Sequence, residues 1–330
     1  MDRPGSRMIR RGQPLKQRRL AGRGYLVYYG LTVSIWGAEA VLTKLFLSDV
    51  LAPGAMLVLR VLITSLVLAP LVLLKKPPLY RLQRRDWAAL LALSLLGTAL
   101  PTLLYFIALA MIPASTTMLL YRTEPIFVIV LSALLLGQRV GLRVWLLTIV
   151  AVVCAYLIAV GQLQPPPLGS RTARGVLLML ASTALFAWAT LLGKVLLDKV
   201  APLVLVWLRF SLALPLLAVL FGQEALVAAS QLEPQKWFWL LWMGGISSGL
   251  AYVFYYKGLR GSNVVIASVA TLLGPVVGVT LSVLLLHESF TAVQIAGIAG
   301  LLVTVYFLST SDLWLVGQPV AAGQVDDTMQ

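Results

Sequence analysis

The chain has 330 residues, of which 60% are hydrophobic and 12% charged, and its mean hydropathy is +0.92. Soluble domains are about 25% charged, so this composition excludes an ordinary soluble protein and predicts a polytopic membrane protein. The formal net charge of +14 would suggest a nucleic-acid partner for a soluble protein. In a membrane chain the distribution of charge indicates orientation instead, and we expect no nucleic-acid partner.

Apolar segments of about 20 residues are long enough to cross a bilayer as helices, and the sequence contains ten of them. They cover approximately residues 24–46, 53–74, 87–110, 113–136, 141–160, 174–197, 202–222, 236–258, 262–286 and 291–311. The predicted fold is therefore an all-α polytopic membrane protein with ten transmembrane helices. The single cysteine, Cys154, lies inside one of these segments, so no disulfide within the chain, metal site or cofactor is expected.

Basic residues gather on one side of the predicted helices. Residues 1–23 contain eight Lys or Arg, Lys75 and Lys76 close the second segment, and residues 79–86 add three more. Cytoplasmic segments of membrane proteins carry an excess of Lys and Arg. The sequence therefore predicts that both termini are cytoplasmic, with residues 1–23 as a basic arm and residues 312–330 as a tail.

The second half of the chain repeats the first. A shift of 150 residues superposes Leu-Leu-Leu-Gly-Gln at 134–138 on Leu-Leu-Leu-His-Glu at 284–288, and a shift of 149 aligns Arg60 with Arg209. Because each copy has five spans, an odd number, the second copy has the opposite topology, as in secondary transporters with a site between inverted repeats. The predicted units are 24–161 and 174–311, joined by a linker at 162–173.

The fourth segment contains an acid, a base and a proline near the middle of the membrane: Arg122, Glu124 and Pro125. A charge at the bilayer centre costs at least about 2.5 kcal/mol, so such residues usually serve a function. The proline lacks an amide hydrogen and its ring clashes with the carbonyl of the fourth residue before it, which interrupts the helix. Thr117, Tyr121 and Glu124 share one side of this helix, and we predict that this side lines a substrate or proton pathway.

Two further charges, Glu39 and Arg60, fall at about the same depth as Arg122, given a rise of about 1.5 Å per helical residue. One interpretation is a polar cluster that lines the pathway. The other is a pair, Glu39 with Arg60, that holds the first two helices together. In the second copy, Gly274 and Pro275 repeat the helix break without the charges.

Several aromatic residues lie at similar depths within the segments. They could form a cage for a cationic or flat substrate, or they could simply pack. The candidates are Trp36, Tyr105, Trp188, Tyr252 and Tyr255.

These features resemble the EamA-type drug/metabolite transporter superfamily. The resemblance rests on an aromatic-rich first segment, Leu-Arg in the second, Glu-Pro followed by Leu-Leu-Leu-Gly-Gln in the fourth, and the echo of that motif in the ninth, and it covers residues 25–311. It implies ten helices with cytoplasmic termini, alternating access around a central cavity, and a location in the plasma membrane, which for a bacterium is the inner membrane. One departure is Gln138, where the family usually has Glu, whereas the second copy keeps Glu288.

The sequence thus predicts a secondary transporter that exports or exchanges a small polar metabolite, such as an amino acid-like compound. We expect a monomer or homodimer in the lipid bilayer, with protons as a candidate coupling ion. The alternative is a passive channel, or an intramembrane enzyme or scaffold without transport. An enzyme is not expected, since the segments contain no HExxH motif or paired aspartates. Rings of like charge or a repeated filter sequence, typical of channels, are also not visible.

Overall fold

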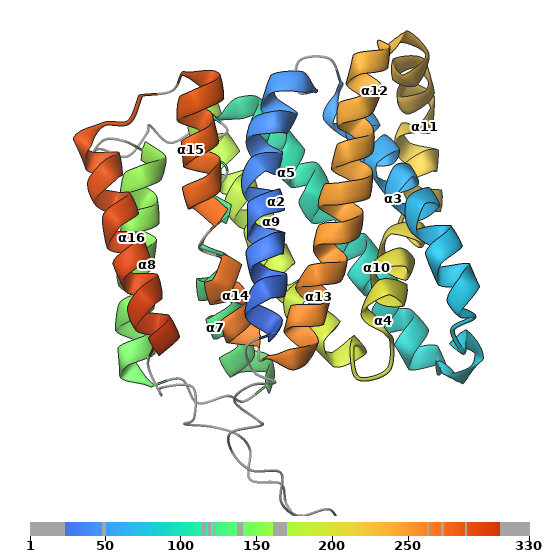
Figure 1. Cartoon of the computed structure of the whole chain (residues 1–330), viewed down its shortest axis with the longest axis horizontal. Coiled ribbons are helices and arrows are strands. Elements are labelled where there is room, and N and C mark those ends of the chain that lie inside the picture. Colours follow the sequence, from blue (N-terminus) through green and yellow to red (C-terminus); the bar gives the residue numbers. More distant parts are fainter. Residues whose placement is uncertain are drawn as a thin grey trace, which may run out of the picture.

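The computed structural model describes residues 24–47, 51–113, 117, 120–121, 123–136, 141–160, 170–262, 264–271, 274–287 and 289–310. Within these ranges every regular element is a helix, and the long helices stand side by side in one bundle (Figure 1). The predicted all-helical protein with apolar spans is confirmed.

The helices of the first half follow one another with short connections. They are α2 (Gly24–Phe46), α3 (Pro53–Lys75), the 3₁₀ turn η1 (Leu79–Arg81), α4 (Arg84–Ser94), the π-helical η2 (Leu95–Ala99), α5 (Leu100–Met111), α7 (Glu124–Leu136) and α8 (Leu142–Val160).

The helices of the second half have a similar order. They are α9 (Arg171–Leu196), α10 (Pro202–Ser211), α11 (Leu214–Gln231), α12 (Pro234–Leu241), the π-helical η3 (Trp242–Leu250), α13 (Ala251–Gly261), α14 (Val264–Thr271), α15 (Gly274–Leu286) and α16 (Ala292–Thr310).

Six helices among the described residues are long and apolar enough to cross a membrane. They are Gly24–Phe46, Pro53–Lys75, Arg84–Met111, Arg171–Leu196, Leu214–Gln231 and Pro234–Gly261. Three shorter helices are also apolar: Glu124–Leu135, Pro202–Ser211 and Ala292–Thr304. Large apolar side chains such as Leu74 and Val219 are more than four-fifths exposed on the outer surface, where lipid rather than water would cover them.

The structure corrects one of the predicted spans. The segment 202–222 is divided into α10 and α11 by a turn at 212–213, because Pro215 lies in the first turn of α11 and cannot donate to the preceding helix. Within the segment 113–136, a turn at Thr123 precedes the helix that begins at Glu124.

Proline begins several helices for the same physical reason. Pro53, Pro202 and Pro234 each occupy the first helical position, where an amide hydrogen has no partner in the helix and a fixed φ is already suitable. The start of α9 instead has a serine cap, since Ser170 accepts a bond from the Ala173 amide (3.1 Å).

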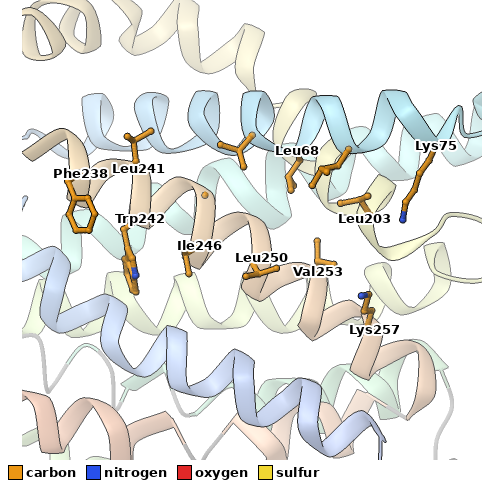
Figure 2. A pocket seen from close by; sticks show the side chains of 13 residues that line it. Leu68, Lys75, Leu203, Phe238, Leu241, Trp242, Ile246, Leu250, Val253 and Lys257 are labelled. Carbon is orange, nitrogen blue, oxygen red and sulfur yellow. The ribbon is translucent and has the colours of Figure 1, made fainter.

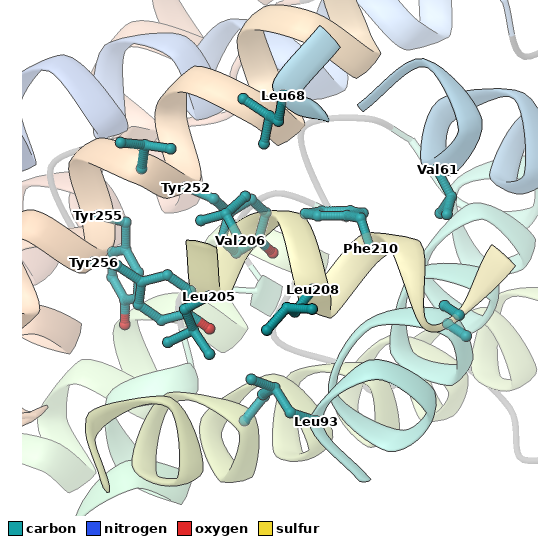
Figure 3. Close-up of a cluster of buried hydrophobic side chains, with 14 of the residues drawn as sticks. Val61, Leu68, Leu93, Leu205, Val206, Leu208, Phe210, Tyr252, Tyr255 and Tyr256 are labelled. Carbon is teal, nitrogen blue, oxygen red and sulfur yellow. The ribbon is translucent and has the colours of Figure 1, made fainter. Parts of the chain in front are cut away.

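Helices from the two halves interleave. α2 packs against α13 and α15, α9 packs against α5 and α7, and α8 pairs with α16 at one edge of the bundle (left in Figure 1). The main apolar core lies where α10 meets α3, α4 and α13 (Figure 3). Its residues include Leu205, Leu208 and Phe210 of α10, with Leu93 of α4 and Tyr256 of α13 nearby.

Two neighbouring glycines in η3 allow a test of this packing. A Cβ at Gly244 would lie 2.6 Å from Ile63 Cγ2 of α3, whereas a Cβ at Gly245 would meet nothing closer than Val67 at 3.8 Å. We expect Gly244→Ala to destabilise the fold by about 1–3 kcal/mol through overpacking. Gly245→Ala is the matched control and should leave the melting temperature in detergent unchanged or slightly raised, since alanine favours a helix. Equal melting temperatures for the two variants would contradict this packing.

Candidate functional site

Two π-helical segments, η2 and η3, interrupt otherwise long helices near the centre of the bundle. Both are rich in small residues: η2 contains Gly97 and Thr98, and η3 contains Gly244, Ser247 and Ser248. A π-helix loosens the regular hydrogen-bond pattern, and such segments are frequent at functional sites. In this protein both segments receive polar side chains from other helices.

Glu39 of α2 and Arg60 of α3 form a buried ion pair through Oε1 and Nη1. The other carboxylate oxygen of Glu39 accepts a bond from the Ser247 hydroxyl, and Arg60 Nε donates to the Ser248 hydroxyl. The Arg60 guanidinium also lies 5.6 Å from the centre of the Phe106 ring. The contact between Glu39 and Arg60 that their equal depth predicts is therefore present, and it extends into η3.

Arg209 of α10 makes a corresponding set of bonds to η2. Its Nε donates to the Thr98 hydroxyl (2.5 Å), Nη2 donates to the Gly97 carbonyl, and Nη1 donates to the Tyr256 hydroxyl (2.7 Å). The Gly97 carbonyl is available because the residue four positions later, Pro101, has no amide hydrogen. Arg209 is only 2% exposed, and its partners among the described residues are neutral rather than carboxylates.

Matching bonds occur at positions 149 or 150 residues apart. Arg60 bonded to Ser248 corresponds to Arg209 bonded to Thr98. Thr32 donates to the Ala251 carbonyl (3.2 Å), as Ser182 donates to the Pro101 carbonyl (2.7 Å). Lys44 donates to the Leu109 carbonyl (3.0 Å), as Lys194 donates to the Leu259 carbonyl (2.7 Å). The position that corresponds to Glu39 is Ala189, so only the first of the two arginines has a carboxylate at this place.

Glu124 is 3% exposed and lies at the start of α7, facing α9 and α13. Its Oε1 accepts a bond from the Thr190 hydroxyl (3.1 Å), and that hydroxyl lies 3.0 Å from the Tyr255 hydroxyl. A buried carboxylate is thus connected to a tyrosine hydroxyl through a threonine. Such a chain of hydroxyl groups can orient a substrate or carry a proton.

Aromatic rings continue from Tyr255 towards both arginines. Trp36 contacts Tyr255 (5.3 Å between ring centres) and Tyr252 (4.8 Å), and its Nε1 donates to the Ser247 carbonyl (3.1 Å). Tyr252 in turn lies under the Arg209 guanidinium at 4.5 Å. One group of aromatic residues in edge-on or tilted contact therefore reaches Arg209 directly, Glu124 through Thr190, and the Glu39–Arg60 pair through Ser247. We call it the aromatic group: Tyr29, Trp36, Tyr252, Tyr255 and Tyr256.

The remaining candidates from the sequence lie at the edges of this centre. The Tyr121 ring packs edge-on against Phe186 (5.5 Å), one turn before Thr190 on α9, so Tyr121 and Glu124 face the same side of that helix. Tyr105 packs against Phe106 (5.6 Å), whose ring lies beside Arg60. Thr117 is buried and donates to the Pro113 carbonyl (3.0 Å). Arg122 lies outside the described residues.

Pro125 is the second residue of α7, which begins at Glu124 directly after a turn at Thr123. The sequence predicts an interruption of the helix at this proline. The Thr123 amide donates to the Leu120 carbonyl (3.0 Å) in the turn that precedes α7. Gly274 and Pro275 are the first two described residues of α15, and residues 272–273 lie outside the described part of the chain. The Gly274 carbonyl lies against α2, where a Cβ on Gly37 would be only 2.6 Å away.

Sequence reasoning missed Thr190, Ser247 and Ser248, which complete the bonds of Glu124, Glu39 and Arg60. The signal available for the serines was a pair of hydroxyls beside Gly244 and Gly245 in an apolar segment. Thr190 had no such signal, since its role depends on the packing of α7 against α9.

The model of the EamA-like transporter family matches residues 24–160 and 173–310. The chain belongs to this family. Two proteins described as uncharacterized transporters are similar to it. One, from Archaeoglobus fulgidus, is 26% identical over 289 residues, which are 86% of this chain and 97% of that protein. The other, from Synechocystis sp., is 26% identical over 229 residues, which are 66% of this chain and 64% of that protein.

A crystal structure of a protein at 15% sequence identity superposes with a TM-score of 0.65 and covers 89% of this chain and 97% of its own. That likeness concerns the fold alone. As a member of the EamA-like transporter family the chain is a multi-pass membrane protein, and the two relatives above are described as transporters.

The buried pair allows a test by neutralisation. Glu39→Gln leaves Arg60 buried without its carboxylate, and Arg60→Gln leaves Glu39 without its cation, so each should destabilise the protein by about 3–5 kcal/mol. The double variant should recover part of this loss, because no uncompensated charge remains. Melting temperatures in detergent for the three variants measure the coupling. Losses that simply add in the double variant would contradict an energetic link between the two residues.

Proposed function

We propose that this EamA-family protein is a secondary transporter that moves a small polar metabolite by alternating access between two inverted halves, residues 24–161 and 174–311. The observation that carries the proposal is the pair of matched arginine contacts. Each arginine belongs to one half and bonds to the π-helical segment of the other half. Contacts of this kind hold two halves together at a place where small side-chain movements can release them.

The two contacts lie inside the bundle, each displaced from its centre towards a different end. Arg60 lies seven residues after Pro53 at one end of α3, and Arg209 lies seven residues after Pro202 at the start of α10, so each is about 10 Å from its own end. The aromatic group contacts both places, since Trp36 donates to the Ser247 carbonyl and Tyr252 lies against Arg209, and Glu124 is connected to it through Thr190 and Tyr255. In an alternating-access cycle, releasing the Arg60 contact would open one end, and releasing the Arg209 contact would open the other.

The substrate would meet Glu124, Thr190 and Tyr255 when the site opens, with Trp36 and Tyr252 beside them. A carboxylate surrounded by aromatic rings suits an ammonium group, because both the charge and the ring faces attract a cation. The same carboxylate could instead exchange a proton with the pathway. Both roles fit an amino acid-like substrate with export or exchange as the direction.

We further propose that the basic end of the bundle faces the cytoplasm and that the membrane is the plasma membrane. Lys75, Arg84, Arg85 and Lys199 lie at that end, as does the start of α2 that follows the basic arm 1–23. Translocating so many Lys and Arg would be costly, which favours cytoplasmic termini.

Transport should depend on Glu124. The protein is reconstituted in proteoliposomes, and flux of a panel of radiolabelled amino acids and related metabolites is measured with and without a pH gradient. If Glu124 carries the coupling proton, Glu124→Gln should retain exchange but lose the response to the gradient. If Glu124 binds the cationic group of the substrate, the same variant should lose binding at every pH.

The exposed residue Glu233 supplies the matched control, since Glu233→Gln removes the same charge at the surface, at the N-terminal end of α12, and should transport normally. Full gradient-driven transport by Glu124→Gln would contradict both roles and leave Glu124 as a structural residue. If the unaltered protein transports none of these compounds, the proposal of an amino acid-like substrate is wrong.

The inverted arrangement predicts the sides of two positions. Reporter fusions at Gln330 should be active in the cytoplasm, and fusions at Gln164 should be active outside, because five spans separate the basic arm from the linker. Activity of the two fusions on the same side would contradict a five-span inverted repeat.

A further inference from the structure

An apolar groove runs along the outer surface between α3 and the continuous helix formed by α12, η3 and α13 (Figure 2). Its volume is about 640 Å³. Most of its side chains are aliphatic or aromatic, and several are about half exposed, among them Leu71, Phe238 and Leu241. The groove does not overlap the polar centre described above.

The shape of the groove depends on Gly245. A Cβ at this position would have only Val67 within 4 Å, at 3.8 Å, so the glycine leaves open space between the two helices. The neighbouring Gly244 instead packs tightly against Ile63 of α3, where a Cβ would lie only 2.6 Å from the Ile63 side chain. Gly244 is thus packed closely against α3, whereas Gly245 leaves space that forms part of the groove.

The groove has a basic end. Lys75 at the C-terminus of α3 and Lys257 of α13 both line it, beside Leu203, and Figure 2 shows both ammonium groups at the same end. Lys257 Nζ lies over the rings of Tyr28 (5.5 Å) and Phe254 (6.0 Å), which positions it. In the part of the chain that the structure describes, neither ammonium pairs with a carboxylate.

We propose that this groove binds one phospholipid with an anionic headgroup, with the phosphate between Lys75 and Lys257 and an acyl chain along the groove. The apolar part from Val253 to Leu241 is about 18 Å long at 1.5 Å per residue, close to the roughly 15 Å of one bilayer leaflet. Basic pockets between transmembrane helices at the cytoplasmic side commonly hold anionic headgroups. A transmembrane helix from a second protein would fill the apolar part but would leave both ammonium groups without a counter-charge.

The bound lipid would affect the polar centre through η3, without direct contact. Trp242, Ile246 and Leu250 of η3 line the groove, and Ser247 and Ser248 of the same segment bond to Glu39 and Arg60. A lipid in the groove therefore supports the π-helical segment on its outer face while the ion pair holds its inner face.

The test uses the purified full-length protein and native mass spectrometry with titrated lipid. Phosphatidylglycerol should bind more tightly than phosphatidylcholine with the same acyl chains. Lys75→Gln/Lys257→Gln should weaken phosphatidylglycerol binding by about tenfold or more and leave phosphatidylcholine binding unchanged. The matched control is Arg84→Gln/Arg85→Gln, which removes two exposed charges at the same end but outside the groove and should bind as the unaltered protein does.

A second variant tests the apolar part independently of charge. Gly245→Leu fills the groove where the glycine leaves space, and it should lose phosphatidylglycerol binding while its melting temperature without lipid stays close to that of the unaltered protein. Equal binding of the two lipids, or an equal loss in the Arg84/Arg85 control, would overturn the proposal. So would glycerol phosphate binding as tightly as the lipid, which would assign the lysines to a free phosphate. Dimers without lipid that Gly245→Leu disrupts would assign the groove to a second copy of the chain.

Discussion

A charged group buried inside the bundle needs partners within the protein, because the surrounding lipid offers none. This constraint explains why Arg60 lies against η3 and Arg209 lies against η2. A guanidinium needs several acceptors, and the π-helical segments provide them as hydroxyls and loosened carbonyls. In η2 the acceptor exists because Pro101 deprives the Gly97 carbonyl of its usual partner. A carbonyl that lacks its partner within the helix thus accepts a bond from a side chain of the other half.

The same constraint joins the core to the candidate site. Arg209 brings α10 against η2, and Arg60 brings α3 against η3, so the apolar core around α10 forms between the helices that these bonds align. Small residues at the contacts allow the close approach, as at Gly97 against Ala189, where an added Cβ would lie 2.7 Å from the alanine Cβ. Polar bonding and close packing therefore depend on each other, and neither the aromatic group nor Glu124 would keep its position without them.

The sequence predicts the features that depend on single segments or on helices adjacent in the chain. The apolar runs predicted the helices, since length and hydropathy alone decide which segments can cross a bilayer. Equal depth predicted the contact of Glu39 with Arg60, because both residues lie on helices adjacent in the chain. The break between α10 and α11 was missed although Pro215 was visible, since a proline near one end of an apolar run does not reveal whether the helix kinks or restarts.

The π-helical segments could not be predicted, because no periodicity distinguishes five or nine residues of π-helix from α-helix in a uniformly apolar sequence. The bond of Thr190 to Glu124 depends on α7 packing against α9, which are far apart in the chain. The bonds of Arg209 to Gly97, Thr98 and Tyr256 also depend on packing between helices that are far apart in the chain. What escapes sequence reasoning is the polar chemistry between distant helices, and here that chemistry forms the candidate site.

The replacement of Glu39 by Ala189 at the corresponding place has a kinetic consequence. A carrier built from two identical inverted halves would present equivalent faces to the two sides of the membrane and would work equally well in both directions. Here one arginine is held by a carboxylate and the other by neutral acceptors. Loss of one partner from a buried ion pair costs about 3–5 kcal/mol, while about 1.4 kcal/mol already changes a population ratio tenfold. In the proposed alternating-access cycle, this one difference between the halves is enough to populate the two end states unequally at rest.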